Sequence, residues 1–301
     1  MKLGEKMPID VCFSSEEEKR DAVKREEIAF ATRLGRVSEA LSADRKNRIV
    51  GLCGPTCAGK TTAADRLCAA FAAKGRRVHI ISVDDFYYDK EILHRLSAEE
   101  DGQIDYDSPK TIDLEALSAC VGQIRAEGVL SCPRFDFDSG VRKEWREIRY
   151  GEDDVFMFEG IQVIYPDVLR QLLPYGFVGV YIAPMRTLCY DGVEISPNTL
   201  RLMRRLVRDS IYRATDPVFT LQLWQSVRAN EEKRIFPFVD RFAYHIDSTF
   251  AYEPGILKPY LSRLLADVAG DEAEHIRQSI AKVDEIHRAY LEADSLYHEF
   301  I

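Results

Sequence analysis

The amino-acid sequence predicts an α/β fold in which a parallel β-sheet is covered by helices on both faces. Short apolar runs rich in β-branched residues alternate with helical stretches, which is typical of buried parallel strands joined by crossover helices. A glycine-rich loop follows the first of these runs and precedes a helical stretch. The expected strands cover residues 49–53, 78–83, 155–158, 177–182 and 243–246.

Helical extensions are expected at both ends of the sheet domain. Ser15 and Glu18 form a capping-box pattern ahead of apolar residues at helical spacing, so residues 15–43 are predicted to be a helix. A second amphipathic helix is expected over residues 271–298. We therefore divide the chain into an N-terminal helical extension (1–46), a main domain (47–265) and a C-terminal helix (266–301).

The composition excludes several classes of function. The net charge is -9, from 41 basic and 50 acidic side chains, so the chain has no overall attraction to nucleic acid or to anionic membranes. The seven cysteines are irregularly spaced, which indicates reduced thiols and not a zinc or disulfide framework. No apolar run is long enough to span a bilayer, and no signal-peptide core is present. We expect a cytoplasmic protein; a homo-oligomer is left open.

Residues 54–61 fit the pattern Gly-x-x-x-x-Gly-Lys-[Ser/Thr], which predicts a phosphate-binding loop for ATP. Gly54 and Gly59 permit backbone angles that turn N–H groups into one concavity, and Lys60 adds a positive charge for the outer phosphates. The Thr61 hydroxyl is a candidate ligand of Mg²⁺, and the following helix directs its positive end at the same anion. The predicted nucleotide-binding residues are Gly54, Pro55, Thr56, Cys57, Ala58, Gly59, Lys60, Thr61 and Thr62.

Acidic side chains follow two of the expected strands. Asp84 and Asp85 come after the second strand, and Glu159 comes after the third. In open parallel sheets, ligands bind beyond the carboxyl ends of the strands. One carboxylate could accept a proton from an acceptor hydroxyl, and another could hold Mg²⁺ directly or through water. The alternative is that these acids are solvated or cap the next helix; the adjacent phosphate loop favours function.

A stripe of arginines lies in a predicted helix further along the chain, at Arg201, Arg204, Arg205 and Arg208, with Arg213 after it. Several of these positions share one helical face. Guanidinium groups bind phosphate oxygens and stabilise charge during phosphoryl transfer, so we expect a mobile lid over about residues 191–230. The alternative is a solvated basic face that pairs with acids such as Asp209.

With these motifs in this order, the chain resembles the uridine kinase and phosphoribulokinase family of P-loop kinases over about residues 47–265. Further segments resemble one branch of nucleoside kinases, often fused behind a domain like the N-terminal part of threonyl-tRNA synthetase. About 47 residues precede the kinase region, so we expect no such fusion. The resemblance implies the P-loop NTPase fold, with a five-stranded parallel sheet. The segments that carry the family resemblance are 54–62, 82–87, 106–109, 133–142, 158–160 and 201–213, and those of the branch are 224–228, 231–238 and 257–260.

The resemblance also implies roles for matching residues in an ATP-dependent nucleoside kinase. Asp84 matches the catalytic aspartate, which takes the proton of the sugar 5′-hydroxyl, and Glu159 matches an acidic residue of the magnesium shell. The implied metal ligands are Thr61, Asp84 and Glu159. The implied catalytic residues are Lys60, Asp84, Arg204 and Arg213.

The implied substrate-binding residues lie on the acceptor side. Tyr87 matches an aromatic residue near the nucleoside, and Asp107 matches the carboxylate that grips the ribose hydroxyls. Phe135 and Phe137 match aromatic positions that line the base pocket. Arg142 and Arg201 complete this set.

Two departures from the family pattern concern the base. The resemblance implies that pyrimidine-specific relatives place a tyrosine at the position of Phe135 and a histidine at the position of Gly140. Both polar contacts to the base edge are absent here, and the space at Gly140 could admit a purine. Since apolar pockets discriminate weakly, we expect broad or purine-leaning specificity.

Two other readings stay open. One is a P-loop kinase of another small alcohol or of a sugar phosphate, similar to pantothenate kinase or phosphoribulokinase. The other is a nucleotide-binding switch without catalysis. The complete set of Lys60, Thr61, Asp84 and Glu159 favours an enzyme over a switch.

Overall fold

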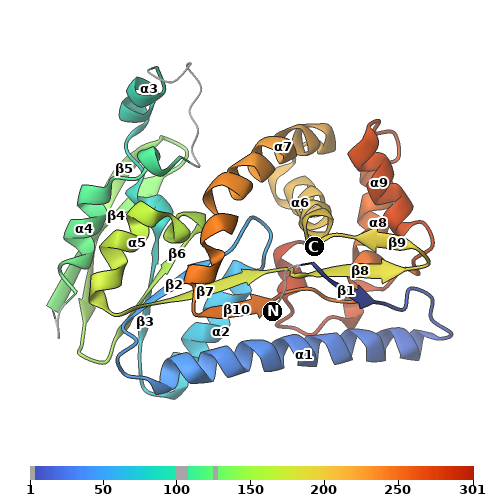
Figure 1. Ribbon diagram of the computed structural model, residues 1–301, viewed down its shortest axis with the longest axis horizontal. Coiled ribbons are helices and arrows are strands. Elements are labelled where there is room, and N and C mark those ends of the chain that lie inside the picture. The colour runs from blue at the N-terminus through green and yellow to red at the C-terminus, as the bar shows by residue number, and fades with distance from the viewer. Residues whose placement is uncertain (1–3, 99–107, 125–127) are drawn as a thin grey trace.

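A five-stranded sheet lies at the centre of the computed structural model, which describes residues 4–98, 108–124 and 128–301 (Figure 1). All its strands are parallel and follow the order β10-β7-β2-β6-β3. The five strands predicted from the sequence are confirmed, with ends that differ by one residue at most. Their bounds are β2 Ile49–Cys53, β3 Val78–Ser82, β6 Val155–Glu159, β7 Phe177–Ala183 and β10 Tyr244–Asp247.

The sheet separates two hydrophobic cores because successive side chains of a strand point to opposite faces. In β2, Val50 and Leu52 enter one core together with helices α1 (Glu16–Ala43) and α2 (Lys60–Ala73). Ile49 and Cys53 enter the other core. Helices α4 (Leu114–Val121) and α5 (Pro166–Leu172) cover this second face, and α3 (Lys90–Ala98) projects beyond it in Figure 1. The predicted two-sided α/β architecture is confirmed.

The N-terminal extension belongs to the main core. Helix α1 begins at the predicted place, where the Ser15 side chain accepts a hydrogen bond from the Glu18 N–H. Its apolar face buries Phe30, Leu34 and Leu41 against the sheet domain. A strand that the sequence did not predict, β1 (Glu5–Pro8), pairs in parallel with β8 (Arg186–Tyr190), which pairs with β9 (Val193–Ile195).

A two-stranded antiparallel hairpin, β4 (Gly128–Asp136) and β5 (Val141–Tyr150), was also not predicted. Strand β5 contains six charged residues and five exposed positions, so it lacks the apolar run of a buried strand. Two helices lie between β7 and β10 in the sequence, α6 (Pro197–Arg213) and α7 (Pro217–Arg234). Two more follow β10, α8 (Glu253–Leu264) and α9 (Asp271–Ile280). Within the described ranges, no helix is long and apolar enough to cross a bilayer.

The predicted C-terminal helix is wrong beyond its first third, because α9 ends at Ile280. The Asp284 N–H donates to the Val11 carbonyl at 2.7 Å, and the Ile286 N–H donates to the Gly255 carbonyl at 3.1 Å. These contacts with distant segments replace the hydrogen bonds of a continued helix. The approach is close: a Cβ atom on Gly255 would lie 2.7 Å from the Asp284 carbonyl oxygen. The later residues form only short turns of 3₁₀ helix, at Arg288–Tyr290 and Leu296–Glu299.

Candidate active site

The phosphate-binding loop joins β2 to α2, as the sequence predicted. Gly59, the N-cap of α2, has φ +93°, and Cys57 also lies in the left-handed region with φ 57°. Gly54 is needed for a different reason from the one we expected. Its φ is not positive, but a Cβ atom there would lie 2.2 Å from the Ile182 carbonyl oxygen of the neighbouring strand.

Two side chains at the start of α2 form hydrogen bonds with other groups of the chain. Lys60 Nζ donates to the carbonyl oxygens of Gly54, at 2.9 Å, and Pro55, at 3.3 Å, so its ammonium group lies over the loop. Thr61 is exposed. The Thr62 N–H and hydroxyl both donate to the Glu299 carboxylate, at 2.7 and 2.6 Å. A residue 237 positions away thus binds a backbone donor of the loop's helix.

A cavity of 420 Å³ lies beside the loop and brings together several residues that the sequence singled out. Thr56 and Lys60 come from the loop, Asp84 and Glu159 from the ends of two neighbouring strands, and Arg213 from the end of α6. Arg205 of the predicted arginine stripe also lines the cavity. The rest of the lining contains residues that were not predicted as site residues: Ile161, Gln162, Tyr165, Val227, Asn230, Glu231 and Ile235.

Two adjacent aspartates have separate environments. Asp84 lines the cavity, and burial raises the pKa of its carboxyl group; a hydrogen bond from Gln162 opposes this rise, and the nearby Glu159 charge adds to it. Asp85 instead accepts the Phe135 N–H at 3.1 Å and lies 3.8 Å from the Arg146 guanidinium. Burial raises the pKa of Asp85 as well. Only Asp84 of the pair is placed to meet a ligand, while Asp85 attaches the β4–β5 hairpin.

Three aromatic rings form a cluster on the acceptor side. The Tyr87 and Phe135 centroids are 5.6 Å apart, and those of Phe135 and Phe137 are 5.2 Å apart, both edge to face. Phe135 is nearly buried, whereas Phe137 is 66% exposed. Tyr87 also lines the 420 Å³ cavity, so the cluster extends from the cavity to the surface.

The other positions expected on the acceptor side either differ from the expectation or lie outside the described residues. Arg142 donates to the Asp113 carboxylate at 2.7 Å and lies over the Tyr88 ring, outside the cavity lining. The expected free space at Gly140 is not present, because a Cβ atom there would lie 3.0 Å from the Lys90 Cβ. Asp107 lies outside the described residues.

The arginines predicted to form a mobile lid divide into two groups. Arg201 is buried and forms a two-pronged ion pair with Glu231, at 2.6 and 2.7 Å. Arg204 is fully buried and forms a similar pair with Glu253. Because these paired charges lie in the core, the start of α6 cannot belong to a freely moving lid, which corrects our expectation.

Both buried arginines also hold the phosphate-binding loop. Arg204 Nη1 donates to the Cys57 carbonyl at 3.1 Å and Nη2 donates to the Ser248 carbonyl at 2.6 Å. Arg201 Nη1 makes a longer bond to the Thr56 carbonyl, at 3.4 Å. The outward carbonyl groups of the loop are therefore bound by cations, which leaves its N–H groups as the anion-binding side.

The second group of arginines surrounds Asp209. Arg205 and Arg208 donate to its carboxylate at 3.2 and 2.7 Å, and Arg213 lies 3.5 Å from it. Arg213 is 58% exposed at its side chain and lines the 420 Å³ cavity together with Arg205. These are the residues of α6 that can reach a bound anion.

A larger cavity, of 1260 Å³, opens on the other side of the phosphate-binding loop. Its walls are α1, α2, the end of α6 and the C-terminal segment, which we define as residues 293–301. The loop thus lies between the smaller cavity, which contains Asp84 and Glu159, and the larger cavity, which lies next to α2.

The donor set fits a hard divalent cation that keeps most of its water. Within the residues that the structure covers, no three His, Cys, Asp or Glu side chains cluster to hold a metal. Mg²⁺ is usually bound by one or two carboxylates together with substrate phosphates, so a full protein cage is not required. The Thr61 hydroxyl and the carboxylates of Asp84 and Glu159 supply oxygen ligands of the right kind.

Comparisons with known proteins identify the family of this chain. Residues 49–248 match the model of the Phosphoribulokinase / Uridine kinase family. The chain is 28% identical over 162 residues to uridine-cytidine kinase A of Dictyostelium discoideum and 27% identical over 165 residues to uridine kinase of Listeria innocua. These matches cover 54% and 55% of this chain, but 28% of the Dictyostelium protein and 69% of the Listeria protein.

Among solved structures, the protein described as a possible uridine kinase from Bacillus stearothermophilus superimposes with a TM-score of 0.47 at 18% identity, over 73% of this chain and 100% of that one. That likeness adds nothing to the family assignment. The matched region contains the phosphate-binding loop, both strand-end acids and the arginine helix. The chain therefore belongs to the phosphoribulokinase and uridine kinase family of P-loop phosphotransferases.

Proposed function

We propose that this chain is an ATP-dependent nucleoside kinase that phosphorylates the 5′-hydroxyl of a nucleoside. The observation that carries the proposal is the 420 Å³ cavity, because the Asp84 carboxylate and the Lys60 ammonium group line one space beside the phosphate-binding loop. The curated relatives named as uridine kinases support a nucleoside as the acceptor.

In this proposal, the loop N–H groups and Lys60 bind the ATP phosphates, and Arg213 approaches them from the end of α6. Thr61, Asp84 and Glu159 would hold Mg²⁺, which neutralises phosphate charge when it is bound. Arg201 and Arg204 would act indirectly, because they bind the loop carbonyls and not the cavity.

Asp84 would orient the acceptor hydroxyl and take its proton. The burial that raises its pKa makes its carboxylate a stronger base than an exposed aspartate. Asp85 cannot take over this role in the observed geometry, because its carboxylate binds the hairpin.

The nucleoside base would stack against Tyr87, Phe135 and Phe137, while Asp107 would hold the ribose and Arg142 would act from the rim. Stacking on aromatic rings tolerates any flat base. Lys90 occupies the neighbourhood of Gly140, so weak base selectivity would come from the missing hydroxyl at Phe135 and not from added space.

A second candidate is a kinase whose acceptor is a sugar phosphate or another small anionic alcohol such as pantothenate. Arg205 and Arg213 both line the cavity, and two guanidinium groups favour an anionic acceptor. A cavity of 420 Å³ also suits a small molecule.

The test is ATP consumption and product formation with one panel of acceptors: uridine, cytidine, adenosine, guanosine, inosine, ribulose 5-phosphate and pantothenate. We expect turnover with nucleosides, differing by less than a hundredfold in kcat/KM, and loss of turnover in Lys60→Ala. Turnover with only the sugar phosphate or pantothenate would select the second candidate. Absence of turnover with every acceptor would contradict the proposal that the chain is an enzyme.

A further inference from the structure

Gln162 is a buried side chain that connects the functional groups of the 420 Å³ cavity. It is 2% exposed and lies in a short 3₁₀ helix, Ile161–Ile164, that follows Glu159 and Gly160. Its Nε2 donates to Asp84 Oδ1 at 2.5 Å and to the Tyr87 hydroxyl at 2.7 Å. The Tyr87 hydroxyl is also hydrogen-bonded to the Asp84 carboxylate. One amide group thus joins an acid and an aromatic residue of the acceptor side.

This arrangement fixes the direction of the amide. A carboxylate only accepts hydrogen bonds, so the NH₂ group must face Asp84, and both of its hydrogens are used. Among the described residues, Gln162 Oε1 has no hydrogen-bond partner although it is buried. Buried polar atoms are usually paired, so the unpaired Oε1 lowers the stability of the fold. The two hydrogen bonds of the Gln162 NH₂ group are thus kept at that cost.

The backbone makes room for this side chain. Gly160 has φ +139°, and a Cβ atom there would lie 2.7 Å from Gln162 Oε1. A glycine directly after Glu159 therefore allows the amide to fold back towards Asp84. The contact between Gln162 and Asp84 is thus built into the turn after β6.

We propose that Gln162 is a positioning residue, which holds the Asp84 carboxylate in the orientation that receives the acceptor hydroxyl. This inference rests on the proposed function, since it assigns Asp84 the hydroxyl proton. Gln162 contacts Asp84 and Tyr87 and would act through Asp84. Its removal should therefore lower kcat and leave the KM for ATP unchanged.

The experiment is a double-mutant cycle with Gln162→Leu and Asp84→Asn, measured with the best nucleoside of the panel. We expect Gln162→Leu to lower kcat by roughly tenfold to hundredfold in the wild-type background and by less than about threefold in Asp84→Asn. Gln123→Leu is a matched control, because the Gln123 amide also makes two hydrogen bonds but lies away from the cavity.

Equal losses in both backgrounds, or an unchanged kcat, would overturn the positioning role. A wild-type protein without turnover on any acceptor would instead remove the proposed function, and this inference with it. A kcat that falls together with a lower melting temperature in both Gln162→Leu and Gln123→Leu would indicate a structural role alone and would also overturn it.

A separate observation concerns the other side of the phosphate-binding loop, where the C-terminal segment contacts it. The Glu299 carboxylate accepts both donors of Thr62, which is the third residue of α2. Leu296 packs against the loop so closely that a Cβ atom on Gly59 would lie 2.1 Å from Leu296 Cδ1. A carboxylate and an apolar side chain thus cover the start of the helix.

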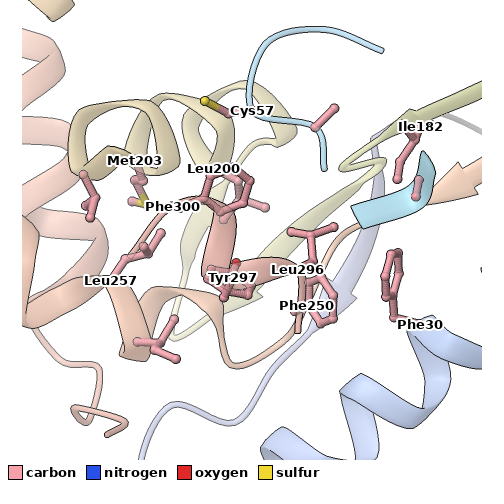
Figure 2. Close-up of a cluster of buried hydrophobic side chains, with 14 of the residues drawn as sticks. Phe30, Cys57, Ile182, Leu200, Met203, Phe250, Leu257, Leu296, Tyr297 and Phe300 are labelled. Carbon is pink, nitrogen blue, oxygen red and sulfur yellow. The ribbon is translucent and has the colours of Figure 1, made fainter. Parts of the chain in front are cut away.

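The segment is anchored by burial on both sides of Glu299. Tyr297 and Phe300 are buried and lie beside the Arg204 guanidinium, with ring centroids 5.6 and 5.3 Å from it. Figure 2 shows Leu296, Tyr297 and Phe300 among side chains from the sheet domain. Glu299 itself is only half-buried, so its carboxylate can leave Thr62 while its neighbours stay in place.

We infer that Glu299 is an internal competitor for the nucleotide. The first N–H groups of a helix after a phosphate-binding loop bind phosphate oxygens, and a carboxylate satisfies the same donors. A nucleoside triphosphate must therefore displace Glu299 from Thr62. This inference also rests on the proposed function, but only on the binding of ATP.

The test is calorimetric binding of ATP with Mg²⁺ to wild type, Glu299→Ala and the control Glu292→Ala, whose carboxylate lies on the exposed surface of the same region. We expect Glu299→Ala to bind ATP roughly tenfold more tightly, since one charged hydrogen-bonding group no longer competes. Its unliganded melting temperature should fall, because α2 loses a cap.

Equal or weaker ATP binding by Glu299→Ala would overturn the competitor role and leave Glu299 as a helix cap only. Failure of all three proteins to bind ATP would contradict the proposed function as well. The control should match wild type in both affinity and melting temperature.

Discussion

The two halves of helix α6 carry the same type of residue in opposite environments. Near its start, Arg201 and Arg204 are buried, each paired with a glutamate and each bonded to a carbonyl of the phosphate-binding loop. Near its end, Arg205, Arg208 and Arg213 share one carboxylate and border the two cavities. The first half binds the loop, and the second half borders the two cavities.

The difference shows what a helical period can and cannot predict. Spacing of three or four residues places side chains on one face, but it does not reveal whether that face is solvated or buried. The partners decide the environment here, because Glu231 and Glu253 come from α7 and α8 and neutralise the first two arginines. These acids are 30 and 49 residues away in sequence.

The largest effect is expected at the buried end of the helix. Arg204→Ala would leave the fully buried Glu253 carboxylate without its partner, and removing one member of a buried pair costs about 3–5 kcal/mol. We expect urea unfolding to show a loss of this size in the free energy of unfolding.

The double variant Arg204→Ala with Glu253→Ala provides the control, because it leaves no unpaired buried charge. It should be less destabilised than the sum of the two single variants. A loss below 1 kcal/mol in Arg204→Ala would show that Arg204 is solvated, and the two halves of α6 would then be alike.

At the exposed end, the effect should appear in the rate and not in stability. Arg213→Ala removes a cation that lines the cavity, and loss of one such charge-stabilising donor lowers kcat by roughly 10²–10³-fold. The free energy of unfolding should change by less than about 0.5 kcal/mol, because the side chain is largely exposed.

Steady-state kinetics of the Arg213→Ala protein measure the change in kcat, and urea unfolding of the same protein measures the change in the free energy of unfolding. Arg36→Ala, which changes an exposed arginine of α1 that lines neither cavity, is the control for a simple change in surface charge. Unchanged turnover in Arg213→Ala would mean that the exposed half of α6 does not act on the phosphates.

A smaller loss of stability is expected at Arg201 than at Arg204. Glu231 also accepts a hydrogen bond from Arg228 at 2.5 Å, so Arg201→Ala leaves this carboxylate with one cation. Glu253 has no second ion-pair partner among the described residues. We expect about 1–3 kcal/mol for Arg201→Ala, and a loss equal to that of Arg204→Ala would contradict the sharing of Glu231.

The sequence predicted best what depends on local pattern. The strands of the central sheet are rich in apolar residues, and the phosphate-binding loop has a fixed spacing, so both were found, with strand ends within one residue. Asp84 and Glu159 were found because the ends of parallel strands meet at one edge. Gln162 was missed although it lies three residues after Glu159, since no charge marked it.

The remaining features depend on contacts between distant segments. The helix predicted over residues 271–298 has the right apolar spacing, but hydrogen bonds from Asp284 to Val11 and from Ile286 to Gly255 redirect the chain. The contact between Glu299 and Thr62 gives no local signal at all. Strand β1 likewise needs β8 to exist, and four residues are too few to predict alone.

The smallest expected effect is a local change in hydrogen exchange along α6. Amides from Leu200 to Val207 lie in the core and should exchange slowly with or without ATP, because exchange there needs opening of the packed domain. Ile211 and Tyr212 are exposed, and Arg213 lies beside the cavity, so amides of residues 211–215 should exchange faster without ATP. Binding of ATP should slow them by about tenfold, since a bound phosphate would hold Arg213 and close this end of the helix. Slowing along the whole of α6 would restore a lid that moves as one unit, and no slowing at residues 211–215 would remove Arg213 from the phosphate site.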